Sequence, residues 1–415
     1  MKKMAVSKVA IRLVLLVTVI TMTACGGGSG NGNQGIATTA ARGDVVATAL
    51  LATVTAAQAQ QMMTSVGITA ATSRYDVKAY KITYKTLDPS GTLVNASGLV
   101  VVPQKASGVM SPLLSVQHGT IFRTSEAPTS PGSFHFGTGS ALASIGYITV
   151  MPDYLGYGDS SGTLHPYLHA QTLASSSIDM LRAARKFLQQ NAIAVNGKLF
   201  LAGYSEGGYA TLAMQKEMET NLSSEFSITA SEPGAGPYDM SATTRTMLAA
   251  ATLPEPSYAA FVVKAYDAIY NNPSEIGNYI QPAYVGAVNS SFDGTKDMAT
   301  IDDALGGGSI APGDLFGQSF LTSYAGTGEA KLKAAMASND IYNWAPKVPT
   351  RLFHGTQDTI VPYANAATAL ATMQADGSTS VEVANCTATP SNHNNCGAPF
   401  LLDAKAFFDT KSPGL

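Results

Sequence analysis

The sequence has few charged residues and no excess of basic ones. Only 13% of its 415 residues are charged, and 25 lysines and arginines against 28 aspartates and glutamates leave a formal net charge of −3. A protein that binds nucleic acid needs a basic surface to attract the phosphates. Here the basic residues are scattered, apart from a cluster at the extreme N-terminus. We therefore expect no nucleic-acid partner.

The apolar run near the N-terminus is short. It covers residues 13–20, whereas a membrane-spanning helix needs about 20 apolar residues. Basic residues precede this run and small residues follow it, which is typical of an export signal. Residues 22–25 resemble the lipobox of bacterial lipoproteins, in which the cysteine is lipidated and becomes N-terminal after cleavage. The sequence thus predicts a signal peptide over residues 1–25 and a membrane anchor at Cys25. The alternative is an ordinary signal peptide and a secreted protein.

Cysteine is scarce as well, with three in the whole chain. A chain of this length can bury a sufficient core without disulfides or metals. Lipidation accounts for Cys25, and the other two, Cys386 and Cys396, lie close together near the C-terminus. We expect these two to form a disulfide in an oxidising compartment. A zinc site with His393 is not expected, because a fourth ligand is absent.

The order of predicted elements indicates an α/β fold. A glycine-rich stretch predicts a flexible tether over residues 26–43, and an alanine-rich one predicts a helix over residues 44–63. Residues 77–86 and 93–102 predict strands, after which short strands alternate with helices. Such alternation gives a mostly parallel sheet with helices on both faces. The later strands are expected at residues 113–117, 147–151, 198–202, 227–231, 350–353 and 380–383, and the helices at 169–190, 206–221, 363–374 and 398–408.

One long stretch interrupts this alternation. Residues 236–346 contain no clear strand, but several short segments rich in alanine and tyrosine that proline and glycine interrupt. Long structureless loops are uncommon in compact domains, so we expect a helical cap inserted in the α/β fold. The core would then consist of residues 44–235 and 347–415.

The most informative motif is G-x-S-x-G at residues 203–207. An apolar strand is predicted directly before it and a helix directly after it. This context is typical of a nucleophile elbow, in which a tight turn holds the serine in a strained conformation that exposes its Oγ. The glycines avoid clashes with the strand and helix, and the helix N-terminus favours developing negative charge. We therefore predict Ser205 as a nucleophile.

A serine nucleophile needs a base, which an acid orients. In the fold that carries this motif, the chain order is serine, acid, histidine. Of six histidines, two follow Ser205, and only His393 also follows a plausible acid with room for a strand and a helix between them. That acid is Asp358, in the turn at the carboxyl end of a predicted strand, where functional residues of parallel sheets gather. His393 itself is expected in a polar loop after the last strand.

Together these residues resemble the α/β-hydrolase superfamily. Residues 354–362 are similar to the His-Gly-x-x-Asp-x-x-Val-Pro stretch that carries the triad acid in many of its members, with His354 at a non-catalytic position. Residues 152–160 resemble a stretch of secreted lipases and esterases with a helical cap, including the secretory lipase family. The resemblance extends from about residue 77 to the C-terminus, without much of the cap. It implies hydrolysis of a carboxylic ester through an acyl-enzyme, without a cofactor.

The resemblance also implies an oxyanion hole. One donor is the backbone N–H after the nucleophile, here that of Glu206. The segment His118-Gly119-Thr120 resembles the His-Gly-x segment that supplies the second donor, so Gly119 or Thr120 is expected to provide it.

Two other functions stay open alongside an esterase or lipase that acts on acyl or aromatic esters. A peptidase of the same fold, such as an aminopeptidase, would need a carboxylate in the cap to bind the amino terminus of its substrate. Glu255, Glu275 and Asp302 are available, although each is interpreted as a solvated side chain. The third function is a lipid-tethered binding protein with an inactive hydrolase fold, against which the serine–acid–histidine order argues.

Overall fold

The computed structural model describes residues 40–271 and 273–412. The predicted signal peptide, the lipidation at Cys25 and most of the tether lie outside the described residues. Within the described part, no helix combines the length and the apolar character that crossing a bilayer requires.

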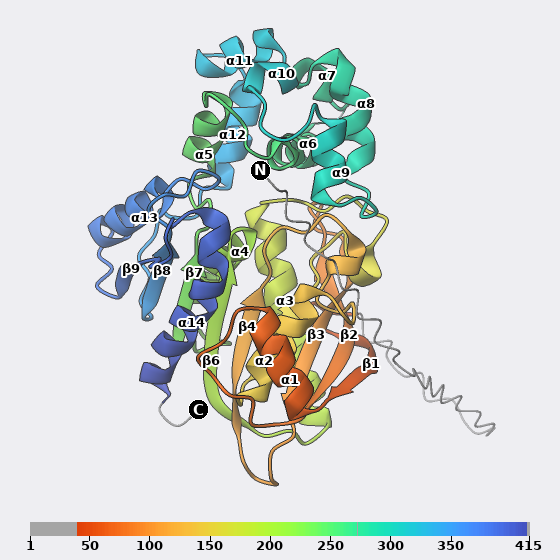
Figure 1. Ribbon diagram of the computed structural model, residues 1–415, viewed down its shortest axis with the longest axis vertical. Helices are drawn as coiled ribbons and strands as arrows, with labels where there is room; N and C mark the ends of the chain where they lie inside the picture. The colour runs from red at the N-terminus through yellow and green to blue at the C-terminus, as the bar shows by residue number, and fades with distance from the viewer. Residues whose placement is uncertain (1–39, 272, 413–415) are drawn as a thin grey trace, which may run out of the picture. The chain divides into compact units, whose positions relative to one another are not determined.

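A nine-stranded sheet forms the centre of the fold (Figure 1). Its strands lie in the order β1-β2-β3-β5-β4-β6-β7-β8-β9. The pairs from β1 to β5 are antiparallel, and all pairs from β5–β4 onward are parallel. The expected mostly parallel sheet is therefore confirmed. The strands are β1 (Val45–Val54), β2 (Val77–Leu87), β3 (Leu93–Pro103), β4 (Ser111–Gln117), β5 (Ile148–Pro152), β6 (Val195–Tyr204), β7 (Ala230–Gly234), β8 (Thr350–His354) and β9 (Val381–Asn385).

Helices cover both faces of the sheet, and β6 shows how the sequence divides them. Leu199 and Leu201 belong to one buried cluster, whereas Phe200 and Ala202 belong to the other. This alternation follows from the two-residue period of a strand. The first cluster includes residues of α3 (Ala170–Gln190), α4 (Glu206–Asn221) and α13 (Ala364–Ala375). The second includes residues of α1 (Ala56–Ser65), α2 (Phe134–Ser144) and α14 (His393–Lys411).

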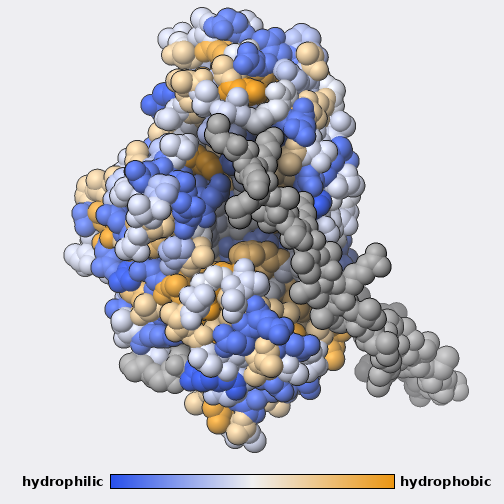
Figure 2. Space-filling view, in the orientation of Figure 1, coloured by the Kyte–Doolittle hydropathy of each residue, from blue (hydrophilic) through white to orange (hydrophobic). Residues whose placement is uncertain are grey.

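The segment predicted as a cap, residues 236–346, is made of short helices between β7 and β8, shown at the top of Figure 1. It joins the rest through buried contacts: the Tyr266 hydroxyl donates to the Leu168 carbonyl over 3.0 Å, and the Tyr209 hydroxyl donates to the Asn339 carbonyl over 2.7 Å. Hydrophilic and hydrophobic residues are interspersed over its visible surface (Figure 2). The helices are α5 (Met240–Leu248), α6 (Pro256–Tyr270), α7 (Ile276–Tyr279), α8 (Pro282–Ser291), α9 (Met298–Ala304), α10 (Pro312–Leu315), α11 (Gln318–Ala325) and α12 (Ala330–Ser338).

In the N-terminal half, one secondary-structure prediction is wrong and one helix was not predicted. The helix expected at residues 44–63 is instead the strand β1 followed by α1. β1 forms a long antiparallel ladder with β2, and these hydrogen bonds outweigh the helix propensity of alanine. Helix α2 was not predicted. Almost all of its residues are buried, so it lacks the amphipathic period that identifies a surface helix.

Candidate functional site

Ser205 lies on the turn between β6 and α4. Its backbone angles are φ 63° and ψ −125°, a strained conformation for any residue other than glycine. The Ser205 N–H donates to the Gly234 carbonyl over 2.9 Å, which ties the turn to the end of β7. The structure thus has the strained strand-to-helix turn that the motif predicts.

Backbone atoms lie so close to the glycines around Ser205 that a side chain at these positions would not fit. A Cβ at Gly203 would come within 2.3 Å of the Gly207 carbonyl oxygen. A Cβ at Gly207 would lie 2.0 Å from the Gln117 oxygen, and one at Gly208 would lie 2.0 Å from the Gly234 oxygen. These contacts are with backbone atoms, so no side-chain movement relieves them. Strands β4 and β7 therefore press against the first turn of α4, which holds the serine in place.

The three predicted residues of the triad meet in one hydrogen-bonded chain. The Ser205 Oγ lies 2.8 Å from His393 Nε2, and His393 Nδ1 lies 2.6 Å from Asp358 Oδ2. An ionised Asp358 can only accept, so His393 carries its proton on Nδ1 and presents Nε2 as the acceptor for the serine hydroxyl. This is the arrangement that activates a serine.

Asp358 is held in its charged form. Burial of the carboxyl group would raise its pKa, but hydrogen bonds and ion pairing with His354 and His393, together with the Val361 N–H, lower the pKa to about 2. Its Oδ1 accepts the backbone N–H groups of Ile360 and Val361 over 3.0 and 2.8 Å. Asp358 therefore orders its own turn and also faces His393.

His393 lies at the first position of α14, and the prediction of a polar loop is wrong here. The side chain of Asn392 caps the helix by accepting the Asn395 N–H over 2.9 Å. The signal was present, because asparagine is a preferred N-cap residue. Pro399 lies inside this helix, and such a residue normally argues for a helix boundary nearby. The Tyr204 hydroxyl donates to the His393 carbonyl over 2.7 Å and links the helix start to the end of β6.

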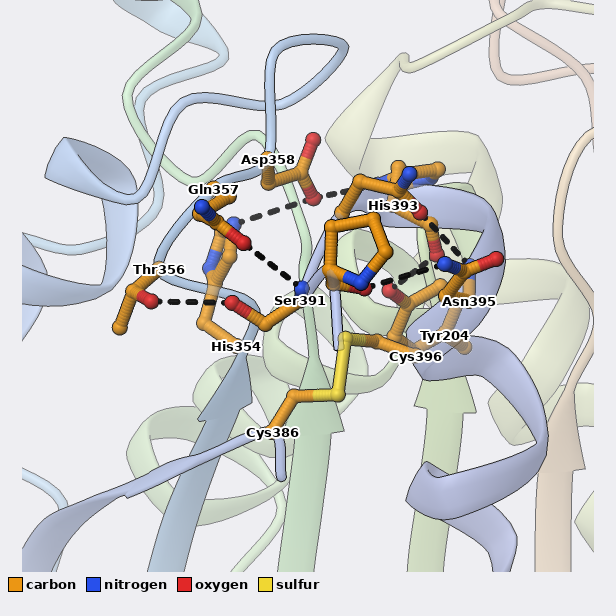
Figure 3. The surroundings of a disulfide bond; sticks show 12 residues. Tyr204, His354, Thr356, Gln357, Asp358, Cys386, Ser391, His393, Asn395 and Cys396 are labelled. Atoms are coloured by element: carbon orange, nitrogen blue, oxygen red, sulfur yellow. Dashed lines mark hydrogen bonds and ion pairs between the residues drawn. A yellow bond between two sulfur atoms is a disulfide. The ribbon is translucent and has the colours of Figure 1, made fainter. Parts of the chain in front are cut away.

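The Cys386–Cys396 disulfide closes next to this helix start (Figure 3). Cys396 follows His393 by three residues in the first turn of α14, and Cys386 directly follows β9. Both cysteines are buried. The Cys386 N–H donates to the His354 carbonyl over 2.8 Å. The bridge thus connects α14, which carries His393, with the end of β9, the neighbour of the strand β8 that leads to Asp358.

A direct contact reinforces this connection. The Gln357 N–H donates to the Ser391 carbonyl over 3.1 Å, and the Ser391 N–H donates back to Gln357 Oε1 over 3.0 Å. The hydroxyls of Thr356 and Ser391 lie 3.0 Å apart, and a dashed line marks this contact in Figure 3. A Cβ at Gly355 would come within 2.2 Å of the Ser391 oxygen. The loop that carries Asp358 and the loop before His393 therefore form one packed unit.

A cavity of about 250 Å³ opens onto Ser205 and His393. Gly119 and Thr120 both line it, so the structure brings the predicted oxyanion loop to the nucleophile. Gly119 packs closely on the elbow, because a Cβ there would lie 3.2 Å from the Tyr204 oxygen. Thr120 Oγ1 lies 2.9 Å from the Tyr167 hydroxyl, and this contact holds the Thr120 side chain.

The side chain of Glu206 makes a contact that the sequence did not indicate. It is buried, and its Oε1 lies 2.7 Å from His165 Nε2. His165 Nδ1 lies 2.6 Å from the Leu155 carbonyl, to which it donates. The pair thus anchors the elbow to the loop after β5.

Sequence reasoning also missed several residues that line the cavity. Phe134, His135 and Thr138 come from α2, and Tyr258 comes from α6 in the cap segment. Ser133, which caps α2 by accepting the Phe136 N–H, was an available signal for that helix. Within residues 40–271 and 273–412, no group of three or more histidine, cysteine, aspartate or glutamate side chains is arranged to hold a metal ion.

The sequence profile of the secretory lipase family matches residues 138–399. No curated protein sequence matches the chain significantly. Among solved structures, a Legionella pneumophila protein is 29% identical, with 89% of this chain and 98% of that chain covered and a TM-score of 0.81.

The rice cell wall degrading esterase LipA from Xanthomonas oryzae is 28% identical, with 90% and 98% of the two chains covered and a TM-score of 0.78. Candida antarctica lipase A in its closed state is 16% identical, with 91% and 84% covered and a TM-score of 0.64, a likeness of fold alone. The profile match spans most of the chain, and this chain belongs to the secretory lipase family.

Proposed function

We propose that this protein hydrolyses carboxylic esters, with Ser205 as the nucleophile, His393 as the general base and Asp358 as the acid that orients it. The observation that carries the proposal is the hydrogen-bonded chain from Ser205 Oγ through His393 to Asp358, with links of 2.8 and 2.6 Å. Membership in the secretory lipase family, together with the related X. oryzae esterase, supports an ester as the bond that is cleaved.

The proposed steps use this hydrogen-bonded chain. His393 Nε2 takes the proton from Ser205 as Oγ attacks the ester carbonyl, and Asp358 stabilises the imidazolium that forms. The oxyanion of the tetrahedral intermediate accepts from the Glu206 N–H and from the N–H of Gly119 or Thr120. His393 then protonates the departing alcohol. Water, activated by the same histidine, releases the acid from the acyl-enzyme.

The division of the chain is part of the proposal. Residues 44–235 and 347–415 form the core, and residues 236–346 form a cap that selects the substrate. Tyr258 supports this role, because it reaches from α6 into the cavity of Ser205. The signal peptide over residues 1–25 and a lipid anchor at Cys25 remain our prediction for export to the cell envelope, and a secreted protein remains the alternative.

A panel of p-nitrophenyl esters of graded acyl length tests the reaction class. We expect hydrolysis of these esters and a loss to trace activity in Ser205→Ala, because the variant has no nucleophile. Amino-acyl p-nitroanilides test the peptidase. If wild type cleaves the anilides and leaves the esters intact, the chain is a peptidase and the proposal is wrong. If neither class is cleaved by folded protein, a binding function replaces both.

A further inference from the structure

A second cavity of about 90 Å³ lies between the cap and the turn that follows Asp358. Residues of α5 and α6 line it from the cap, and Thr359 and Ile360 line it from the core. Tyr258 lines both this cavity and the cavity of Ser205. The two cavities therefore lie on either side of Tyr258 and share it as a wall.

Glu255 is the ionisable carboxylate among the residues that line the second cavity. Its Oε2 is buried and has no hydrogen-bond partner in the part of the chain that the structure describes. The other two cap acids differ: Glu275 accepts the Tyr279 hydroxyl over 2.9 Å, and Asp302 accepts the Ser257 N–H over 2.8 Å. Of these three, Glu255 lines the cavity and keeps one oxygen, Oε2, without a hydrogen-bond partner among the described residues, while Asn394 hydrogen-bonds to its carboxylate.

The surroundings of Glu255 contain little positive charge. The described residues that line the two cavities include neither lysine nor arginine. Burial raises the pKa of Glu255. The nearby His393 ring and a hydrogen bond from Asn394 lower this pKa, and the neighbouring carboxylates Asp302 and Asp358 raise it further. Glu255 is half-buried, but its buried Oε2 lacks a partner among the described residues; such an oxygen is costly, and a cation beside it relieves that cost.

We propose that the second cavity is a subsite for a positively charged group of the ester substrate, with Glu255 as the residue that recognises it. This inference rests on the proposed ester hydrolysis. Met247, Leu253 and Ile360 line the same cavity and suit the methyl groups of a quaternary ammonium. The ring of Tyr258 can add a cation–π contact.

The cation can belong to either half of the ester, and two substrate pairs distinguish them. In the alcohol pair, butyrylthiocholine is compared with the 3,3-dimethylbutyl thioester of butyrate, in which carbon replaces the charged nitrogen. In the acyl pair, p-nitrophenyl 4-(trimethylammonio)butyrate is compared with p-nitrophenyl 5,5-dimethylhexanoate. Each pair differs in charge and hardly in shape. The readout is the ratio of kcat/KM for the cationic ester to kcat/KM for its neutral partner.

We expect wild type to favour the cationic ester in one pair and Glu255→Gln to lower that ratio about tenfold, because the variant keeps the shape and removes the charge. Asp303→Asn is the matched control, since it removes an exposed acid from α9 next to Asp302. It should leave the ratio unchanged. Titration with a fluorophosphonate measures the concentration of active sites in each variant, so that kcat refers to folded, active enzyme.

The pH dependence of the ratio separates recognition from a structural effect. The raised pKa means that Glu255 is charged only above it, so the ratio should increase with pH in wild type and stay flat in Glu255→Gln. Titration of Asp358 affects both esters of a pair equally and cancels in the ratio. Asp302 and Tyr258 also face Glu255 but are unchanged in the variant.

The outcomes are distinct. The subsite is wrong if Glu255→Gln leaves the ratio unchanged, or if the wild-type ratio is near one in both pairs at every pH. In either case, hydrolysis of the neutral esters still supports the proposed function. If wild type hydrolyses no ester of either pair, the proposed function itself fails. Should Glu255→Gln not fold, the wild-type ratio must still increase with pH and decrease at high salt.

Discussion

The disulfide next to the active site should matter for turnover as well as for stability. The perturbation is the double variant Cys386→Ala/Cys396→Ala, or reduction of the wild-type bridge. The cysteines are 10 residues apart, and closing such a loop stabilises the folded state by about 3 kcal/mol in the chain-entropy model. For a folded part of this size, that corresponds to a decrease in Tm of about 3–4 °C.

The effect on turnover follows from position. Cys396 lies in the first turn of the helix that begins at His393, so loss of the bridge loosens the segment that aims Nε2 at Ser205. We expect kcat to decrease at temperatures well below Tm and KM to change less, because most of the cavity lining belongs to other elements than α14. The assay combines ester kinetics with thermal unfolding, with and without a reductant. The double variant is its own control, since the reductant should change neither its Tm nor its kcat.

Two results would refute this reasoning. If reduced wild type keeps its full kcat while its Tm falls, the bridge stabilises the fold without positioning His393. If thiol labelling finds both cysteines free in active native enzyme, the bridge plays no part in either.

Three further predictions concern the same site. Asp358→Asn should remove part of the loss of stability at low pH. The pKa of Asp358 is about 2 in the folded state and 3.8 for a free aspartate, so the charged carboxylate adds about 2 kcal/mol to the free energy of unfolding above pH 4, which is lost as the pH falls toward 2. Urea unfolding at each pH measures this difference. Gly207→Ala should destabilise the fold by at least about 3 kcal/mol, because its Cβ would lie 2.0 Å from the Gln117 oxygen. The control Gly277→Ala has open space around it and should leave stability unchanged. Equal unfolding curves for the two variants would contradict the close approach of Gln117 to Gly207. Tyr204→Phe should cost about 1 kcal/mol through its lost hydrogen bond to the His393 carbonyl, and an unchanged urea midpoint would count against that bond.

Chemistry was easier to predict from this sequence than local structure. Ser205, Asp358 and His393 could be selected because motif spacing and chain order restrict the choice, and the structure brings all three within hydrogen-bonding distance. The parallel strands were predictable because each is a short apolar run bounded by turn residues. Their boundaries differ by a few residues, as for β7, which begins at Ala230 rather than at residue 227.

What could not be predicted depends on contacts between distant segments. β1 is a strand because it pairs with β2, although its alanines favour a helix. The contact of Glu206 with His165 spans 41 residues, and nothing local signals it. Glu255 was interpreted as a solvated side chain, yet Oε2 is buried beside the turn of the triad acid. Such environments depend on how the cap packs on the core.

The most direct test of the central claim is covalent labelling of the nucleophile. Folded protein is treated with a fluorophosphonate, digested and examined by mass spectrometry, in parallel with Ser205→Ala. We predict one adduct on Ser205, loss of esterase activity in proportion to labelling, and neither labelling nor more than trace activity in the variant. Labelling at another residue, or a Ser205→Ala variant that still hydrolyses esters, would contradict the assignment of Ser205 as the nucleophile.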